Sequence, residues 1–114
     1  MLSYREAKAI MDIQSTLSED GSTLTLALPG KFDYTCQQMF QSAYQDVSPK
    51  PEKFVLDALE LQSMDSSALG MLLLLRNHAG GDDADVAIVN AKPDIIKLLE
   101  TCKFNELFKV SALG

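Results

Sequence analysis

The sequence holds few of the residues that build metal and disulfide sites. Its 114 residues include one histidine, His78, and two cysteines, Cys36 and Cys102, which lie far apart. A metal ion needs several His, Cys, Asp or Glu ligands together, and a histidine needs partners to act as a general base. We therefore expect no metal site, no catalytic or ligand role for His78 and no disulfide. The two cysteines are predicted to be small core residues of a protein in a reducing cytosol.

Basic residues are also scarce, with 10 Lys and Arg against 16 Asp and Glu and a net charge of −6. Binding to a phosphate backbone needs a basic face, so this balance excludes a nucleic-acid partner. The longest apolar stretch, residues 68–75, is far shorter than the roughly 20 residues that span a bilayer. The first residues, MLSYREAKAIMD, carry charges and lack the apolar core of a signal peptide. The sequence therefore predicts a cytoplasmic protein with no membrane partner.

The motifs of common enzyme sites are missing as well. A hydrolase nucleophile would lie in a Gly-x-Ser-x-Gly turn, but neither Ser66 nor Ser67 has a glycine two residues before or after it. Phosphate-binding loops of the Gly-x-x-x-x-Gly-Lys-Ser/Thr and Gly-x-Gly-x-x-Gly types are not found either. We therefore predict that the protein is not an enzyme, has no catalytic residues and needs no cofactor.

What the sequence does contain is the composition of an ordinary globular chain, 46% apolar and 23% charged. Because no repeat or linker is visible, residues 1–114 are predicted to form one domain with a core over about residues 10–110. Residues 9–17 and the cleanly alternating residues 23–28, separated by a Glu-Asp-Gly turn, predict a β-hairpin. The continuous apolar run at residues 54–56 indicates a central strand covered on both faces, and residues 86–89 indicate another buried strand.

Three further segments have the spacing of helices. The first follows Asp33, which offers an N-cap oxygen, and ends before Pro49; the second runs over about residues 66–79 and is closed by Gly80. The third begins at Pro93, and its apolar stripe includes Cys102. The order β-β-α-β-α-β-α, with room for a short last strand, predicts an α/β protein in which a mixed β-sheet is packed with helices.

The junction before the second helix, Met64-Asp-Ser-Ser-Ala-Leu-Gly70, is the most distinctive local feature. Asp65 can accept hydrogen bonds from the free amides of the first turn, where Ser66 and Ser67 lie about 100° apart around the helix axis. Only one serine is therefore expected to point outward. A phosphate there would be attracted by the free N–H groups and repelled by the Asp65 carboxylate, so it should perturb a surface more than the fold. The alternative is that these are ordinary helix-start residues.

The second helix also carries apolar residues on more than one face, with Leu69, Leu72 and Leu73 on one side and Met71, Leu74 and Leu75 on another. A helix that packs on a sheet needs only one apolar stripe. Either the helix is deeply covered within the fold, or part of its apolar surface contacts a partner, and the sequence leaves both alternatives open.

Over about residues 10–110 the chain resembles a STAS domain, the fold of the bacterial anti-sigma factor antagonists. Val55-Leu-Asp57 followed by Met64-Asp-Ser-Ser-Ala-Leu-Gly70 is similar to the family's Asp-Ser-Ser/Thr-Gly-Leu-Gly signature. Gly30-Lys-Phe-Asp33 resembles its Gly-x-Leu-Asp segment, and residues 93–110 resemble its usual ending. Ala68 departs from the usual glycine. Its extra methyl group is expected to favour the helix slightly, and either to tighten or to impede the close approach of a kinase.

The resemblance implies a bacterial partner-switching module controlled by reversible serine phosphorylation. It implies Ser66 as the phosphoacceptor, with Ser67 as the neighbouring hydroxyl, and a partner-binding face that contains Asp33, Asp65, Ser66, Ser67 and Leu69. The unphosphorylated domain would bind a serine kinase or anti-sigma factor, or a response regulator that carries kinase and phosphatase modules. Phosphorylation would weaken this binding until a serine phosphatase restores it. The alternatives are a constitutive STAS scaffold, and a STAS module that binds a nucleotide or another small ligand.

Overall fold

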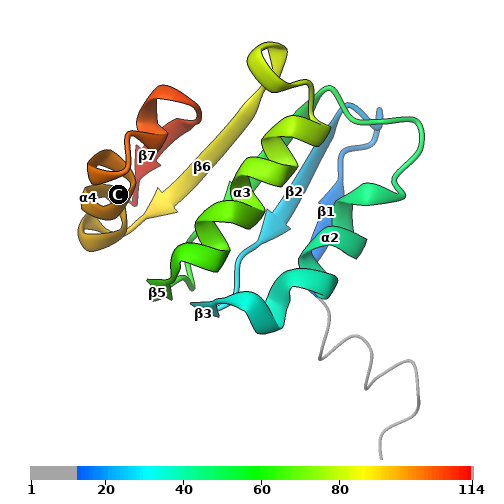
Figure 1. The fold of residues 1–114 in the computed structure, drawn as a ribbon. Helices are drawn as coiled ribbons and strands as arrows, with labels where there is room; N and C mark the ends of the chain where they lie inside the picture. The colour runs from blue at the N-terminus through cyan, green and yellow to red at the C-terminus, as the bar shows by residue number, and fades with distance from the viewer. Residues whose placement is uncertain (1–12, 114) are drawn as a thin grey trace, which may run out of the picture.

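The computed structural model describes residues 13–113, and the main sheet within them has five strands in the order β1-β2-β4-β6-β7 (Figure 1). β1 pairs with β2 antiparallel, whereas the other neighbours are parallel. This arrangement confirms the predicted mixed sheet and the short last strand. The strands are β1 (Ser15–Leu17), β2 (Thr23–Ala27), β4 (Lys53–Asp57), β6 (Val86–Ala91) and β7 (Lys109–Ala112).

The predicted hairpin is present, but β1 is shorter than residues 9–17, of which residues 9–12 lie outside the described part of the chain. Gly21 closes the turn with φ 76°, in the left-handed region that suits glycine. The Asp20 carboxylate accepts hydrogen bonds from the backbone N–H of Ser22 and from the hydroxyls of Ser18 and Ser22. These hydrogen bonds lower the pKa of Asp20 to about 2, because they stabilise its charged form.

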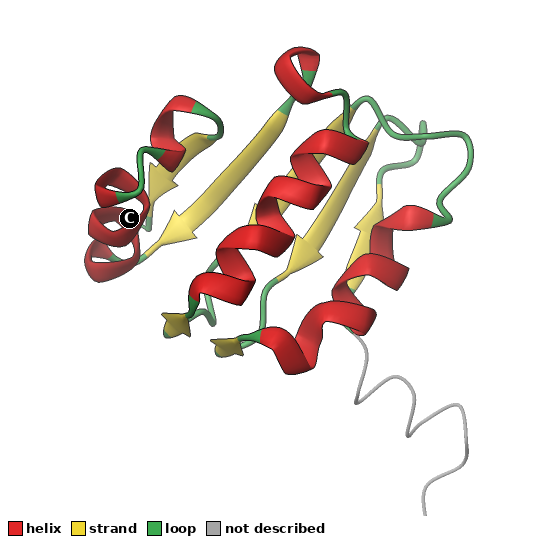
Figure 2. Ribbon diagram, viewed as in Figure 1, coloured by secondary structure: helices red, strands yellow, loops and turns green. Residues whose placement is uncertain are grey.

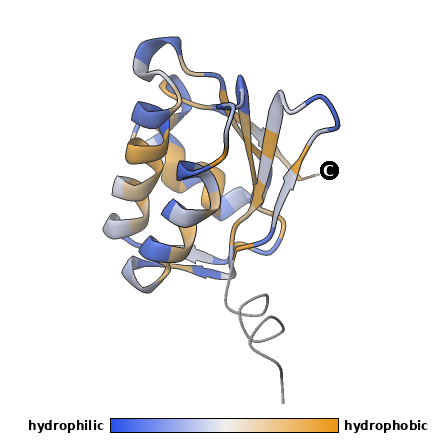
Figure 3. Cartoon of the chain, turned by 90° about the vertical axis from the view of Figure 1, so that its right-hand side faces the viewer, coloured by the Kyte–Doolittle hydropathy of each residue, from blue (hydrophilic) through white to orange (hydrophobic). Residues whose placement is uncertain are grey.

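The helices of the described residues lie together on one face of the sheet (Figures 2 and 3). They are α2 (Gln37–Gln45), preceded by the short 3-10 helix η1 (Tyr34–Cys36), α3 (Ser66–His78) and α4 (Pro93–Thr101). α3 and α4 match their predicted ranges: α3 ends before Gly80 at φ 127°, and Pro93 occupies the first turn of α4. Two further 3-10 turns, η2 (Gly81–Asp83) and η3 (Phe104–Glu106), connect the later elements.

The hydrophobic core lies between this helical layer and the sheet, as the hydropathy colouring shows (Figure 3). Phe54 and Leu56 of β4 are fully buried against it, but Val55 between them is only partly buried. The expectation that β4 is covered on both faces was therefore wrong, because a run of three apolar residues can also come from a strand with one helix-covered face.

The two cysteines have different surroundings, which corrects the prediction that both belong to the core. Cys36 is 5% exposed and its Sγ lies 3.5 Å from the carbonyl oxygen of Lys31. Cys102 is exposed, because α4 ends at Thr101 and the chain turns there before the apolar stripe reaches it. Both cysteines are free thiols.

Candidate functional site

A small second sheet brings two distant loops together. β3 (Lys31–Phe32) pairs in parallel with β5 (Ser63–Met64), and Phe32 stands opposite Met64. The carbonyl oxygen of Gly30 accepts the N–H groups of Gln62 and Ser63 at 2.8 and 3.1 Å, which anchors the pair. Because parallel strands leave a sheet at the same edge, Asp33 and Asp65 follow side by side, and α2 and α3 begin at this edge (Figure 1).

Asp65 is the N-cap of α3. Its backbone is extended, and its Oδ1 accepts the N–H of Ala68 at 2.9 Å, so one free amide of the first turn is satisfied. Ser66 and Ser67 are the first two helical residues, and both are exposed. At about 100° per residue, Ser66 points about 170° away from the buried face of α3 and Ser67 about 90° away. Ser66 is therefore the serine that faces outward, as the sequence required of one of the two.

Asp33 repeats this arrangement in the neighbouring loop. It caps the turn that leads into α2 by accepting the backbone N–H of Thr35 at 3.0 Å and also the Thr35 hydroxyl. Lys31 Nζ lies 3.8 Å from the second carboxylate oxygen. The hydrogen bonds from Thr35, above all that from its hydroxyl, and the Lys31 charge hold the pKa of Asp33 below its usual value of 3.8. The predicted cap is thus present, and it acts on the 3-10 turn that precedes α2.

The outer face of α3 resolves the question that its sequence left open. Met71, Leu72 and Leu75 are buried, whereas Leu73 is 42% and Leu74 52% exposed. Leu69, which we predicted as a partner-binding residue, is half-buried and packs against the core. The helix therefore buries one apolar stripe and presents a second one to solvent. Periodicity could not separate the two stripes, because both consist of the same residue types.

Ala68 is fully buried, so its side chain lies under α3 and not on the exposed face. The expectation that its methyl group could tighten or impede the approach of a kinase was therefore wrong. The methyl group instead fills space in the core, where it also favours the helical conformation over glycine.

Charged residues are missing from both helices near this site, although the whole chain has a net charge of −6. Residues 34–45 and 66–75 contain none. The nearest charges are the capping carboxylates of Asp33 and Asp65, each already engaged by hydrogen bonds. Tyr34, at the start of η1, is 69% exposed and adds an aromatic side chain near the capping loops. The surface around Ser66 is therefore nearly neutral, with exposed apolar groups.

His78 lies at the opposite end of α3. Its ring packs between Tyr44 and Phe54, with centroid distances of 5.1 and 6.1 Å, and Lys50 Nζ donates to its carbonyl oxygen at 2.6 Å. Burial and, after it, the Lys50 charge lower the pKa of His78 below 6.5. Across residues 13–113, His, Cys, Asp and Glu side chains nowhere gather in a group of three that could hold a metal ion.

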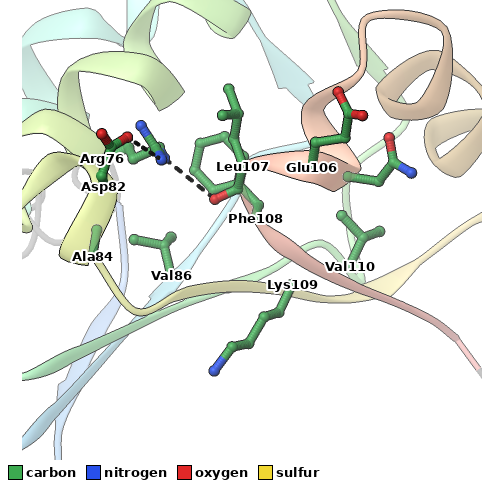
Figure 4. Close-up of a pocket in the computed structure, with 10 residues that line it drawn as sticks. Arg76, Asp82, Ala84, Val86, Glu106, Leu107, Phe108, Lys109 and Val110 are labelled. Atoms are coloured by element: carbon green, nitrogen blue, oxygen red, sulfur yellow. Dashed lines mark hydrogen bonds and ion pairs between the residues drawn. The ribbon is translucent and has the colours of Figure 1, made fainter.

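A groove of about 400 Å³ lies between the end of α3, β6 and the segment from η3 to β7 (Figure 4). The Arg76 guanidinium is occupied there, because Nε donates to the Leu107 carbonyl oxygen and Nη2 pairs with Asp82, both at 3.3 Å. Glu106 and Lys109 add one charge of each sign to the lining. Such a groove offers no cluster of free donors for a phosphate, so it does not favour the nucleotide-binding alternative.

The overall architecture is the STAS fold seen in several solved structures. A STAS-domain anti-sigma factor antagonist from Planctomyces limnophilus superposes with a TM-score of 0.71, 18% identity and coverage of 90% of this chain and 91% of its own. The Bacillus cell fate determinant SpoIIAA, in its phosphorylated form, gives 0.60, 16%, 88% and 91%. A sulfate transporter family protein from Wolinella succinogenes gives 0.70, 11%, 83% and 79%. At these identities the likeness establishes the fold alone.

Sequence comparison places the chain within a family. The family described as "Mlab, STAS domain" matches residues 15–110, and the chain belongs to the STAS domain family. A STAS-domain containing protein of Pseudomonas aeruginosa is 44% identical over 101 residues, which cover 89% of this chain and all of that protein. No helix between residues 13 and 113 is long and apolar enough to cross a membrane.

Proposed function

We propose that this STAS domain is a cytoplasmic protein-binding module, without catalysis of its own, that is switched by reversible phosphorylation of Ser66. In the unphosphorylated state it binds a serine kinase or anti-sigma factor, or a response regulator that carries kinase and phosphatase modules. Phosphorylation weakens that binding, and a serine phosphatase restores it. We infer that Asp33, Asp65, Ser66, Ser67 and Leu69 border the contact surface.

The observation that carries the proposal is the position of Ser66, which points outward from the first turn of α3 beside the Asp33 loop. A kinase can reach its hydroxyl without unfolding the helix. The fold also occurs in anti-sigma factor antagonists, one of which is known in a phosphorylated form, and this supports the same function here.

The electrostatic effect of phosphorylation follows from the neutral surface around Ser66. A phosphate adds about −1.5 to −2 charge. Asp65 already occupies the Ala68 N–H, so the phosphate cannot take that hydrogen bond and instead lies close to a second negative charge. A partner that binds this uncharged surface would have to desolvate the phosphate, which costs free energy unless a cation on the partner compensates it.

The test compares Ser66→Asp with Ser66→Asn, two side chains of nearly equal size that differ in charge. Tagged wild-type protein is expressed in cells of the source organism, its partner is identified by mass spectrometry and purified, and affinities are measured by calorimetry. We expect Ser66→Asp to bind at least about tenfold more weakly than Ser66→Asn, or about 1.4 kcal/mol. Equal affinities would rule out a switch based on charge at this residue.

Intact-mass measurement of the native protein distinguishes the switch from a constitutive scaffold. A phosphorylated form that is lost in Ser66→Ala is expected, and it should be absent from the fraction bound to the partner. If the protein carries no phosphate in any growth condition while the partner stays bound, the scaffold is the correct description.

A further inference from the structure

Gly70 has no role within the described structure that requires glycine. It lies in the interior of α3 and is exposed, and a Cβ atom built on it would meet nothing within 4 Å. Glycine destabilises a helix interior relative to alanine, because it loses more conformational freedom on folding. Neither its backbone conformation nor its packing explains why a less favourable residue stands there. What remains is the solvent side of the helix.

On that side Gly70 is the floor of a small hole. Residues three and four positions away on a helix are its surface neighbours, so Ser66 and Ser67 frame Gly70 on one side and Leu73 and Leu74 on the other. All four are exposed, the two leucines by 42% and 52%. Four residues around a small central one form the kind of hole that receives a single side chain from a neighbouring protein element. We call these five residues the Gly70 hole.

The surroundings of the Gly70 hole favour an uncharged, apolar occupant. No charged residue lies within residues 66–75 or within residues 34–45 of the neighbouring α2. The buried centres of protein interfaces are depleted in charge, whereas the remainder of this chain carries 16 acidic and 10 basic residues. The two exposed leucines provide apolar contact, and the missing side chain at Gly70 allows close approach to the helix backbone.

We propose that the protein that binds at Ser66 inserts an apolar side chain into the Gly70 hole, and that Gly70 is retained for this contact at the expense of helix stability. The proposal rests on the function proposed above, because it extends the same surface by one helical turn. Ser66 forms part of the rim of the hole and lies about 6 Å along the helix axis from Gly70. A phosphate on Ser66 would therefore place its charge at the edge of the apolar contact, where the partner must exclude water.

The test adds a methyl group to the hole by Gly70→Ala and removes part of its rim by Leu73→Ala. Asn77→Ala is the matched control, because Asn77 is exposed on the same side of α3 but lies beyond the hole. Thermal unfolding is followed by circular dichroism, and the affinity for the purified Ser66-dependent partner is measured by calorimetry. We expect Gly70→Ala to raise the melting temperature by about 2–6 °C. The same variant should weaken binding at least about tenfold, as a filled pocket at the centre of an interface does.

The two further variants separate the hole from the rest of the helix. Leu73→Ala should also weaken binding about tenfold. Asn77→Ala should change the affinity by no more than about twofold, as surface substitutions away from a contact do. If Gly70→Ala folds more stably and binds as tightly as wild type, the hole is not a binding site, and the Ser66 switch is unaffected by that result. If no protein binds in a manner that depends on Ser66, the proposed function fails and the occupant of the hole fails with it. Sedimentation that shows self-association of the wild type, abolished in Gly70→Ala, would identify a second copy as the occupant and overturn the proposal.

Discussion

Replacement of Asp65 tests whether the start of α3, and with it the position of Ser66, depends on one hydrogen bond. Asp65→Ala removes the acceptor of the Ala68 N–H, whereas Asp65→Asn keeps an acceptor oxygen and removes only the charge. The pair therefore separates the hydrogen bond from the attraction between the carboxylate and the helix dipole.

The expected magnitude follows from the burial of the orphaned group. Loss of an N-cap side chain costs about 0.5–2 kcal/mol, and loss of a negative charge at a helix start costs about 0.3–1 kcal/mol. Ala68 is 0% exposed, so water cannot replace the lost acceptor, and the cost should lie toward the upper end. We expect Asp65→Ala to lower the free energy of unfolding by about 2 kcal/mol, or the melting temperature by about 8 °C, and Asp65→Asn by about 0.5 kcal/mol.

Urea unfolding followed by circular dichroism measures these differences, and an unchanged slope with denaturant shows that the unfolded state is comparable. If Asp65→Ala lies within about 0.5 kcal/mol of wild type, the cap does not stabilise the helix. If both variants lose the same free energy, the charge and not the hydrogen bond is responsible.

Three further predictions concern His78, Ala68 and Ser66. NMR titration of the one histidine should give a pKa below 6.5, because burial and the Lys50 charge disfavour the imidazolium. The unfolded chain then binds the proton first, so stability should fall as the pH drops below 6.5, and a slope that persists in His78→Gln would contradict this assignment. Ala68→Gly should lower the free energy of unfolding by about 1 kcal/mol and leave the calorimetric affinity for the partner unchanged, because the methyl group faces the core. Ser66→Asp should differ from Ser66→Asn by less than about 1 kcal/mol in urea unfolding, because dipole attraction and repulsion by Asp65 oppose each other; a larger loss would mean that charge at Ser66 acts by unfolding the helix.

Much of the fold could be predicted from the sequence, because many of its elements carry their own local signals. The alternation of β2 and the apolar spacing and caps of α3 and α4 gave ranges that agree closely with the structure. The candidate serine could also be narrowed to one of two, since neighbouring residues of a helix point in different directions. These features depend on interactions within a few residues.

Other features depend on contacts between distant segments, and no local pattern indicates them. β3 and β5 have two residues each, too few for any periodicity, yet their pairing places the Asp33 loop beside Asp65 and Ser66. The partial burial of Val55 and the exposure of Cys102 likewise follow from where the helical layer lies and where α4 ends.

The sequence by itself determined that this chain is an acidic α/β protein with a capped serine pair at the start of one helix, because composition, periodicity and caps are local properties. Only the tertiary structure decided that Ser66 is the outward serine, that Leu73 and Leu74 face solvent while Met71 and Leu72 do not, and that Gly70 lies open between them. The physical reason is that an α-helix has several faces of similar composition, and the face that is buried is chosen by the sheet against which the helix packs.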